Sequence, residues 1–80
     1  MANPGTPSFD QLRIFLTVVD CGSFAGAARR LNRAVSVISY GVVNLEQQLG
    51  VTLFEREGSR KPVLTTAGRV LLAEARTVTQ

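Results

Sequence analysis

Hydroxyl groups and cations are concentrated in the middle of this chain, at a spacing suited to hydrogen bonding with a polar partner. Ser36, Ser39 and Tyr40 lie within five residues of one another, shortly after Arg33. Serine hydroxyls bond phosphate oxygens or nucleobase edges, and the guanidinium fork matches a phosphate. More basic residues follow at Arg56, Arg60 and Lys61. These residue types favour recognition of an anionic, hydrogen-bonding polymer.

Residues that carry catalysis or bind metals are scarce. The sequence has no His and one Cys. An internal disulfide, a Cys-cluster zinc site and His-based acid–base catalysis are therefore excluded. The carboxylates show no metal-site spacing, and no Gly-rich phosphate loop follows a strand. We predict no enzyme activity, no metal site and no cofactor in this domain. We expect Cys21 to behave as a half-buried apolar residue, and the alternative is that Cys21 is redox-active.

Length and composition indicate one small globular domain. The 80 residues are 45% hydrophobic and 19% charged, with a net charge of +3, and the sequence pI is about 10.0. Eight of the nine basic residues are Arg. No apolar run approaches the roughly 20 residues of a membrane span, and the N-terminus lacks signal-peptide order. We predict a cytoplasmic protein without membrane association. Charge alone would indicate only that the arginines form an ordinary solvated surface.

The first half of the chain has the pattern of two helices. Residues 1–8 are predicted to be a flexible leader, although Ser8 also begins a capping-box sequence. Apolar residues at helical spacing predict a helix over about 9–21, which Gly22 ends. A short second helix is expected over 24–31, with small residues that permit close helix packing. Two helices separated by a tight turn begin a helix-turn-helix.

A third helix should carry the hydroxyl groups. It is predicted to begin near residues 34–36 and to end at Leu49, before Gly50. Its apolar stripe is Ile38, Val42, Leu45 and Leu49. The other side carries Ser36, Ser39, Tyr40 and Val43. This helix would therefore bury one face and present the other.

The remaining residues predict a hairpin and a last helix. Residues 51–55 and 61–64 favour two strands joined by a turn, and Thr65 or Thr66 is expected to cap a helix through the C-terminus. The element order indicates a mainly α fold, a winged helix-turn-helix with a three-helix core and a β-hairpin wing. We place this domain at residues 9–65, followed at 66–80 by the start of a long linker or dimerisation helix.

Two strings of residues are the most specific feature of the sequence. Leu-Gly-Val-Thr-Leu-Phe-Glu-Arg occupies 49–56, and Leu-Thr-Thr-Ala-Gly occupies 64–68. Weaker matching pieces precede them at 11–15, 22–24 and 27–31. On these stretches, which together extend over nearly the whole chain, the sequence resembles the N-terminal DNA-binding domain of LysR-type transcriptional regulators.

The resemblance implies sequence-specific binding of double-stranded DNA, with the third helix (about 35–49) in the major groove and the wing on the flanking backbone or minor groove. Members of this family are longer, and a small-molecule effector would bind their C-terminal domain. They act as homodimers, with a tetramer as a further option for the full-length protein, in the bacterial cytoplasm or on the nucleoid. The expected DNA contacts are Arg33, Val35, Ser36, Ser39, Tyr40, Val43, Arg56, Arg60 and Lys61.

Departures from the family pattern fall where DNA would be read. The family usually has Val-Ser-Gln-Pro or Val-Ser-Gln-Ser where this chain has Arg-Ala-Val-Ser at 33–36. Tyr40 replaces a usual Arg or Lys, and Val43 occupies a position that is commonly basic. These changes leave the expected fold and general DNA binding intact, but they bear on which bases are read.

Each candidate contact has a structural alternative. Ser36 could cap the third helix in place of Ala34, Tyr40 could be half-buried against the wing, and Val35 could extend the core stripe. The basic candidates could simply be solvated, and Glu46 could pair with Arg56. For the domain as a whole, the alternative function is a winged-helix module that docks protein without reading DNA.

The last helix carries more apolar residues than one narrow stripe against the core requires. They are Val70, Leu71, Leu72, Ala75 and Val78. A helix this short is marginal in water without a partner. We therefore expect these residues to form an antiparallel dimer interface, the alternative being that the helix packs wholly on its own domain.

Overall fold

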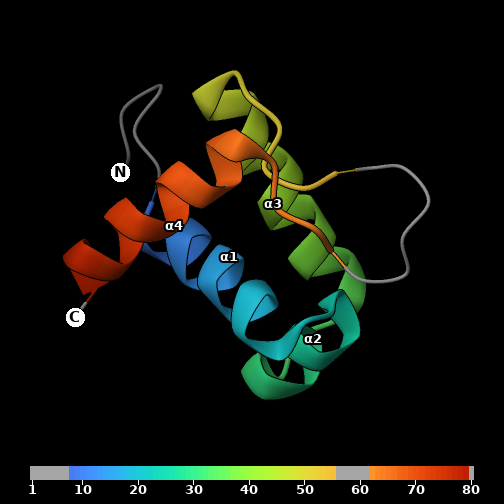
Figure 1. The fold of residues 1–80 in the computed structure, drawn as a ribbon. Coiled ribbons are helices and arrows are strands. Elements are labelled where there is room, and N and C mark those ends of the chain that lie inside the picture. The colour runs from blue at the N-terminus through green and yellow to red at the C-terminus, as the bar shows by residue number, and fades with distance from the viewer. Residues whose placement is uncertain (1–7, 56–61, 80) are drawn as a thin grey trace.

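The computed structural model describes residues 8–55 and 62–79, and its backbone forms four helices (Figure 1). Helix α1 contacts each of the other three helices, and α2 also contacts α3. All four helices match the predicted ranges closely. Their bounds are α1 Phe9–Cys21, α2 Phe24–Leu31, α3 Val35–Leu49 and α4 Thr66–Thr79.

Local hydrogen bonds define both ends of α1. The Ser8 hydroxyl accepts from the Gln11 amide N–H at 3.1 Å, and Gln11 Oε1 accepts from the Ser8 N–H at 2.8 Å. This capping box makes Ser8 part of the folded domain, so the predicted 1–8 leader was one residue too long; residues 1–7 lie outside the described range. Gly22 ends α1 in the left-handed conformation, with φ of 73°, where a Cβ would introduce strain.

The hydrophobic core lies where α1, α2, α3 and the segment after α3 meet. The Phe54 ring joins these parts, because its centroid lies 5.6 Å from that of Phe15 and 5.7 Å from that of Phe24. The other buried members are Ile14, Val18, Ala27, Ala28, Ile38, Val42, Leu45 and Leu53. Ala27 and Ala28 are buried in this core, where α2 contacts α1 and α3, in agreement with the close helix packing predicted for the small residues of the second helix.

The two predicted strands are reduced, within the described residues, to one antiparallel bridge between Phe54 and Leu64. The expectation of strands over 51–55 and 61–64 was therefore wrong for the described part of the hairpin. The Leu53 N–H donates instead to the Glu46 side chain at 2.7 Å, which removes it from a cross-strand ladder. The remaining bonds are Glu55 N–H to the Val63 carbonyl at 2.7 Å and Thr65 N–H to the Leu53 carbonyl at 3.0 Å.

Thr65 connects this segment to α4. Its hydroxyl donates to the Thr52 carbonyl at 2.6 Å and accepts from the Gly68 N–H at 3.0 Å, so Thr65 rather than Thr66 caps α4. Gly68 is required here, because a Cβ at this position would collide with the Leu53 carbonyl oxygen. Helix α4 then packs across α1 (Figure 1), and Arg76 bonds Asp20 at 3.2 Å. None of the helices in the described ranges has the length and apolar character to span a membrane.

Candidate nucleic-acid interface

Helix α3 buries one side and exposes the other. Ile38, Val42 and Leu45 are at most 4% exposed. A second stripe of residues, spaced by four, three and four positions, lies about half a helical turn away from these buried residues. We call it the outward face, and its members are Ser36, Tyr40, Val43 and Gln47. Tyr40 is 69% exposed and Val43 36% exposed. The alternative in which the Tyr40 ring is half-buried against the wing is therefore wrong.

The first turn of α3 begins without a capping side chain. Ala34 is the N-cap residue, with φ of −68° and ψ of 148°, and no side-chain cap bond is present. Ser36 lies inside the helix, so it does not replace Ala34 as the cap. The positive end of the helix dipole and the first backbone N–H groups can thus interact with an anion from outside.

Arg33, predicted to meet a phosphate, is bound within the domain. Its two terminal nitrogens each lie 3.0 Å from an oxygen of Asp10, which ties the start of α1 to the turn before α3. The hydrogen bonds from Arg33 hold the pKa of Asp10 below its usual value, and the same bonds raise the pKa of Arg33. Because both side chains are partly exposed, a phosphate could reach Arg33 by taking the place of the carboxylate.

Arg29 was not among the predicted contacts, yet it lies beside the start of α3. It borders a shallow, open surface depression together with Arg33, Ala34 and Val35. The Val35 side chain is 46% exposed, consistent with a partly free tip. The signal available in the sequence was spacing, since Arg29 precedes Arg33 by one helical turn, and a cation also suits the end of α2.

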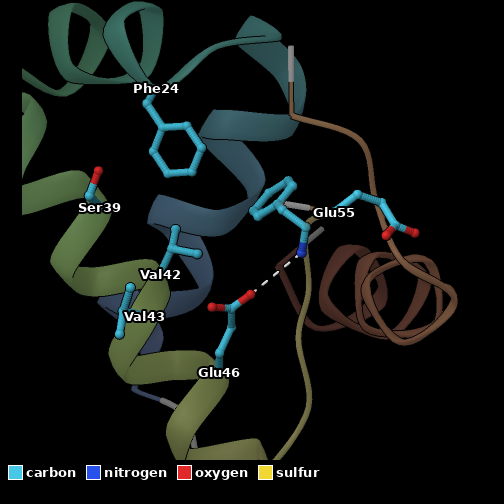
Figure 2. A pocket seen from close by; sticks show the side chains of 7 residues that line it. Phe24, Ser39, Val42, Val43, Glu46 and Glu55 are labelled. Carbon is cyan, nitrogen blue, oxygen red and sulfur yellow. Dashed lines mark hydrogen bonds between the residues drawn. The ribbon is translucent and has the colours of Figure 1, made fainter. Parts of the chain in front are cut away.

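A cavity of about 220 Å³ lies between α3 and the segment that leads to the wing. Figure 2 shows Phe24, Val42 and Glu46 around it. Ser39 and Val43 line the same cavity, so the cavity adjoins the edge of the outward face.

Glu46 has a structural function that sequence reasoning assigned differently. The carboxylate is buried and accepts hydrogen bonds from the Leu53 N–H at 2.7 Å and the Phe54 N–H at 3.5 Å (Figure 2 shows the second). It therefore fixes the distance between α3 and the base of the wing. The proposed partner Arg56, and with it Arg60 and Lys61, lies outside the described residues.

The predicted dimer residues of α4 separate into different environments. Val70 is 56% exposed, whereas Leu71 and Leu72 are partly buried against the domain's own core. Ala75 is 2% exposed, so its assignment to a dimer interface was wrong, because its own chain already covers it. The Val78 side chain lies outside the described part. Over residues 8–55 and 62–79, no three His, Cys, Asp or Glu side chains group as metal ligands would.

A tight turn between two helices, a third helix with an exposed face, and a bridge at the base of a wing define a winged helix-turn-helix protein. Residues 9–69 match the family of bacterial regulatory helix-turn-helix proteins of the lysR type. The chain belongs to this family.

Individual relatives agree with that assignment. The HTH-type transcriptional regulator AceR of Acinetobacter baumannii is 47% identical over 62 residues, which are 78% of this chain and 20% of AceR. The transcriptional activator AllS of Klebsiella pneumoniae is 45% identical over 84% of this chain and 24% of its own length. The BenM DNA-binding domain, solved in complex with catB site 1 DNA, is 37% identical with a TM-score of 0.84, over 89% of this chain and 75% of that one. The chain thus spans about a fifth of the length of AceR and about a quarter of the length of AllS.

Proposed function

We propose that this domain binds double-stranded DNA in a sequence-specific manner, with α3 in the major groove and the wing on the flanking backbone or minor groove. The observation that carries the proposal is the outward face of α3, which is exposed on a helix whose opposite face is locked into the core. A helix presented in this way fits the major groove. The likeness to a DNA-binding domain solved in complex with DNA supports DNA binding by this domain.

Phosphate contacts would come from groups around the start of α3. Arg29 lies on the adjacent surface, and the uncapped first turn offers backbone N–H groups. Arg33 would contribute after exchanging Asp10 for a phosphate. Arg60 and Lys61 are proposed from the sequence alone as the corresponding contacts of the wing.

We further propose that the domain acts as a homodimer within a longer cytoplasmic regulator. The exposed side of α4, marked by Val70, is the surface that supports this arrangement. Two copies would place two recognition helices on related half-sites. Any small-molecule effector is expected to bind outside these 80 residues, and the domain itself is expected to have no catalytic activity.

A single introduced charge tests the DNA orientation. Ser36→Glu places a carboxylate in the first turn of α3, where the helix dipole favours it and folding is preserved. On DNA it would face phosphates, and we expect an affinity loss of about tenfold or more. Gln48→Glu is the matched control, because it adds the same charge near the other end of α3, and it should change affinity by less than about threefold.

The docking alternative gains some support because α3 contains neither Lys nor Arg and exposes valines. It predicts that the folded chain binds no duplex above the background level at low salt. Equal losses for Ser36→Glu and Gln48→Glu would also contradict the proposed orientation.

A further inference from the structure

The exposed surface of α3 is uncharged and rich in apolar groups. Glu46 is the one charged residue between 35 and 49, and it is buried. Among the exposed side chains, Tyr40 is 69% exposed, Val35 and Val37 are both 46% exposed, and Val43 is 36% exposed. Apolar side chains without a cation nearby on the same helix are poorly suited to guanine, which is usually read by Arg or Lys.

The major groove offers one apolar group at its base edges, the C5-methyl of thymine. Tyr40 and Val43 stand next to each other on the outward face, three residues or about 4.5 Å apart along the helix axis. This separation is comparable to the rise of about 3.4 Å between stacked bases. The two side chains can therefore meet methyl groups on neighbouring base pairs.

Polar members of the outward face complement this pattern. Gln47 lies four residues beyond Val43 on the same stripe, and a Gln amide makes a paired contact with adenine. Ser36, at the other end, can bond a phosphate or a base edge. The whole stripe is thus suited to A·T pairs.

We propose that Tyr40 and Val43 determine specificity by contacting thymine methyl groups in the major groove. This inference rests on the proposed DNA-binding function and adds the class of base that α3 reads. The Tyr40 ring, rather than its hydroxyl, would make the contact, so Tyr40→Phe should retain the discrimination between thymine and a base without the methyl group.

The test replaces thymine by deoxyuridine, which removes only the methyl group. A duplex is first selected from a random pool with the 80-residue chain, and each thymine of the enriched sequence is then replaced singly. One or two replacements should weaken binding by about three- to fivefold each, the effect of removing a buried methyl group. The Tyr40→Ala, Val43→Ala double variant should be insensitive to the same replacements, whereas Tyr40→Phe should keep the sensitivity.

The outcomes separate the inference from the function beneath it. If the chain binds its selected duplex specifically but every deoxyuridine duplex binds equally well, the methyl reading is wrong and DNA binding stands. If the deoxyuridine effect persists in the double variant, it comes from DNA shape, and the assignment to Tyr40 and Val43 is overturned. If no duplex is enriched by folded protein, the proposed function fails and the inference fails with it.

Discussion

Replacing Glu46 by Ala should destabilise the domain, because the buried Glu46 carboxylate accepts hydrogen bonds from backbone N–H groups of another segment. The carboxylate accepts from the buried Leu53 N–H at 2.7 Å and, more weakly, from the Phe54 N–H at 3.5 Å. Leu53 is fully buried, so water cannot readily replace the lost acceptor. Glu46→Ala would leave that donor without its partner.

The magnitude follows from the hydrogen bond. A bond to a charged group contributes about 1.5–3 kcal/mol, and an unsatisfied buried donor costs about 1–3 kcal/mol. We take about 2 kcal/mol as the expected loss in the free energy of unfolding. For a domain of this size, 1 kcal/mol corresponds to roughly 4–8 °C in Tm, so Tm should fall by about 8–16 °C.

Chemical and thermal unfolding followed by circular dichroism measure this loss, and Glu46→Gln is the matched variant. The amide keeps a neutral oxygen acceptor of the same reach, so its loss should be about half that of Glu46→Ala. A loss below about 0.5 kcal/mol for Glu46→Ala, or equal losses for both variants, would refute the role assigned to this carboxylate.

Other changes give equally direct expectations. Gly68→Ala should lower the free energy of unfolding by about 1–3 kcal/mol, because the new Cβ would collide with the Leu53 carbonyl oxygen. Gly41→Ala should be near neutral in the same unfolding assay, because its Cβ would meet the end of the Ile14 side chain, which can move. Asp10→Asn should lower Tm slightly at neutral pH and have no effect in strong acid. The hydrogen bonds from Arg33 lower the pKa of Asp10 in the folded state, so its contribution to stability is present above the ordinary pKa of Asp and is lost as the pH falls through the lowered value; a Tm difference that is independent of pH would contradict this. Val70→Glu should shift a dimer to monomer mass in sedimentation while the domain stays folded, whereas Leu72→Glu should unfold it; an intact Val70→Glu dimer would place the interface elsewhere.

The helices could be predicted because their signals are local. Apolar periodicity placed α1 and α3, and cap residues placed their ends: Ser8 before α1, Gly22 after it and Gly50 after α3. Each of these signals lies within a few residues of the feature that it determines. The family resemblance added the order of the elements and the expected recognition helix.

What the sequence did not predict depends on side-chain contacts between different elements of the fold. Nothing in the sequence indicated that Arg33, a predicted DNA contact, pairs with Asp10, 23 positions earlier. The predicted strands lost a ladder bond to Glu46, seven residues before Leu53. Ala75 was assigned to the dimer because periodicity cannot tell a partner's surface from the domain's own core. Side-chain contacts of this kind depend on the packed structure, and a single sequence does not specify them.

Selection from a random duplex pool, followed by affinity measurements at several salt concentrations, tests the central claim most directly. The 80-residue chain should enrich one sequence and bind it at least about a thousandfold more tightly than a scrambled duplex. The scrambled duplex should show the steep salt dependence of phosphate contacts alone. Equal affinity of the folded chain for selected and scrambled duplexes would contradict sequence-specific reading by α3.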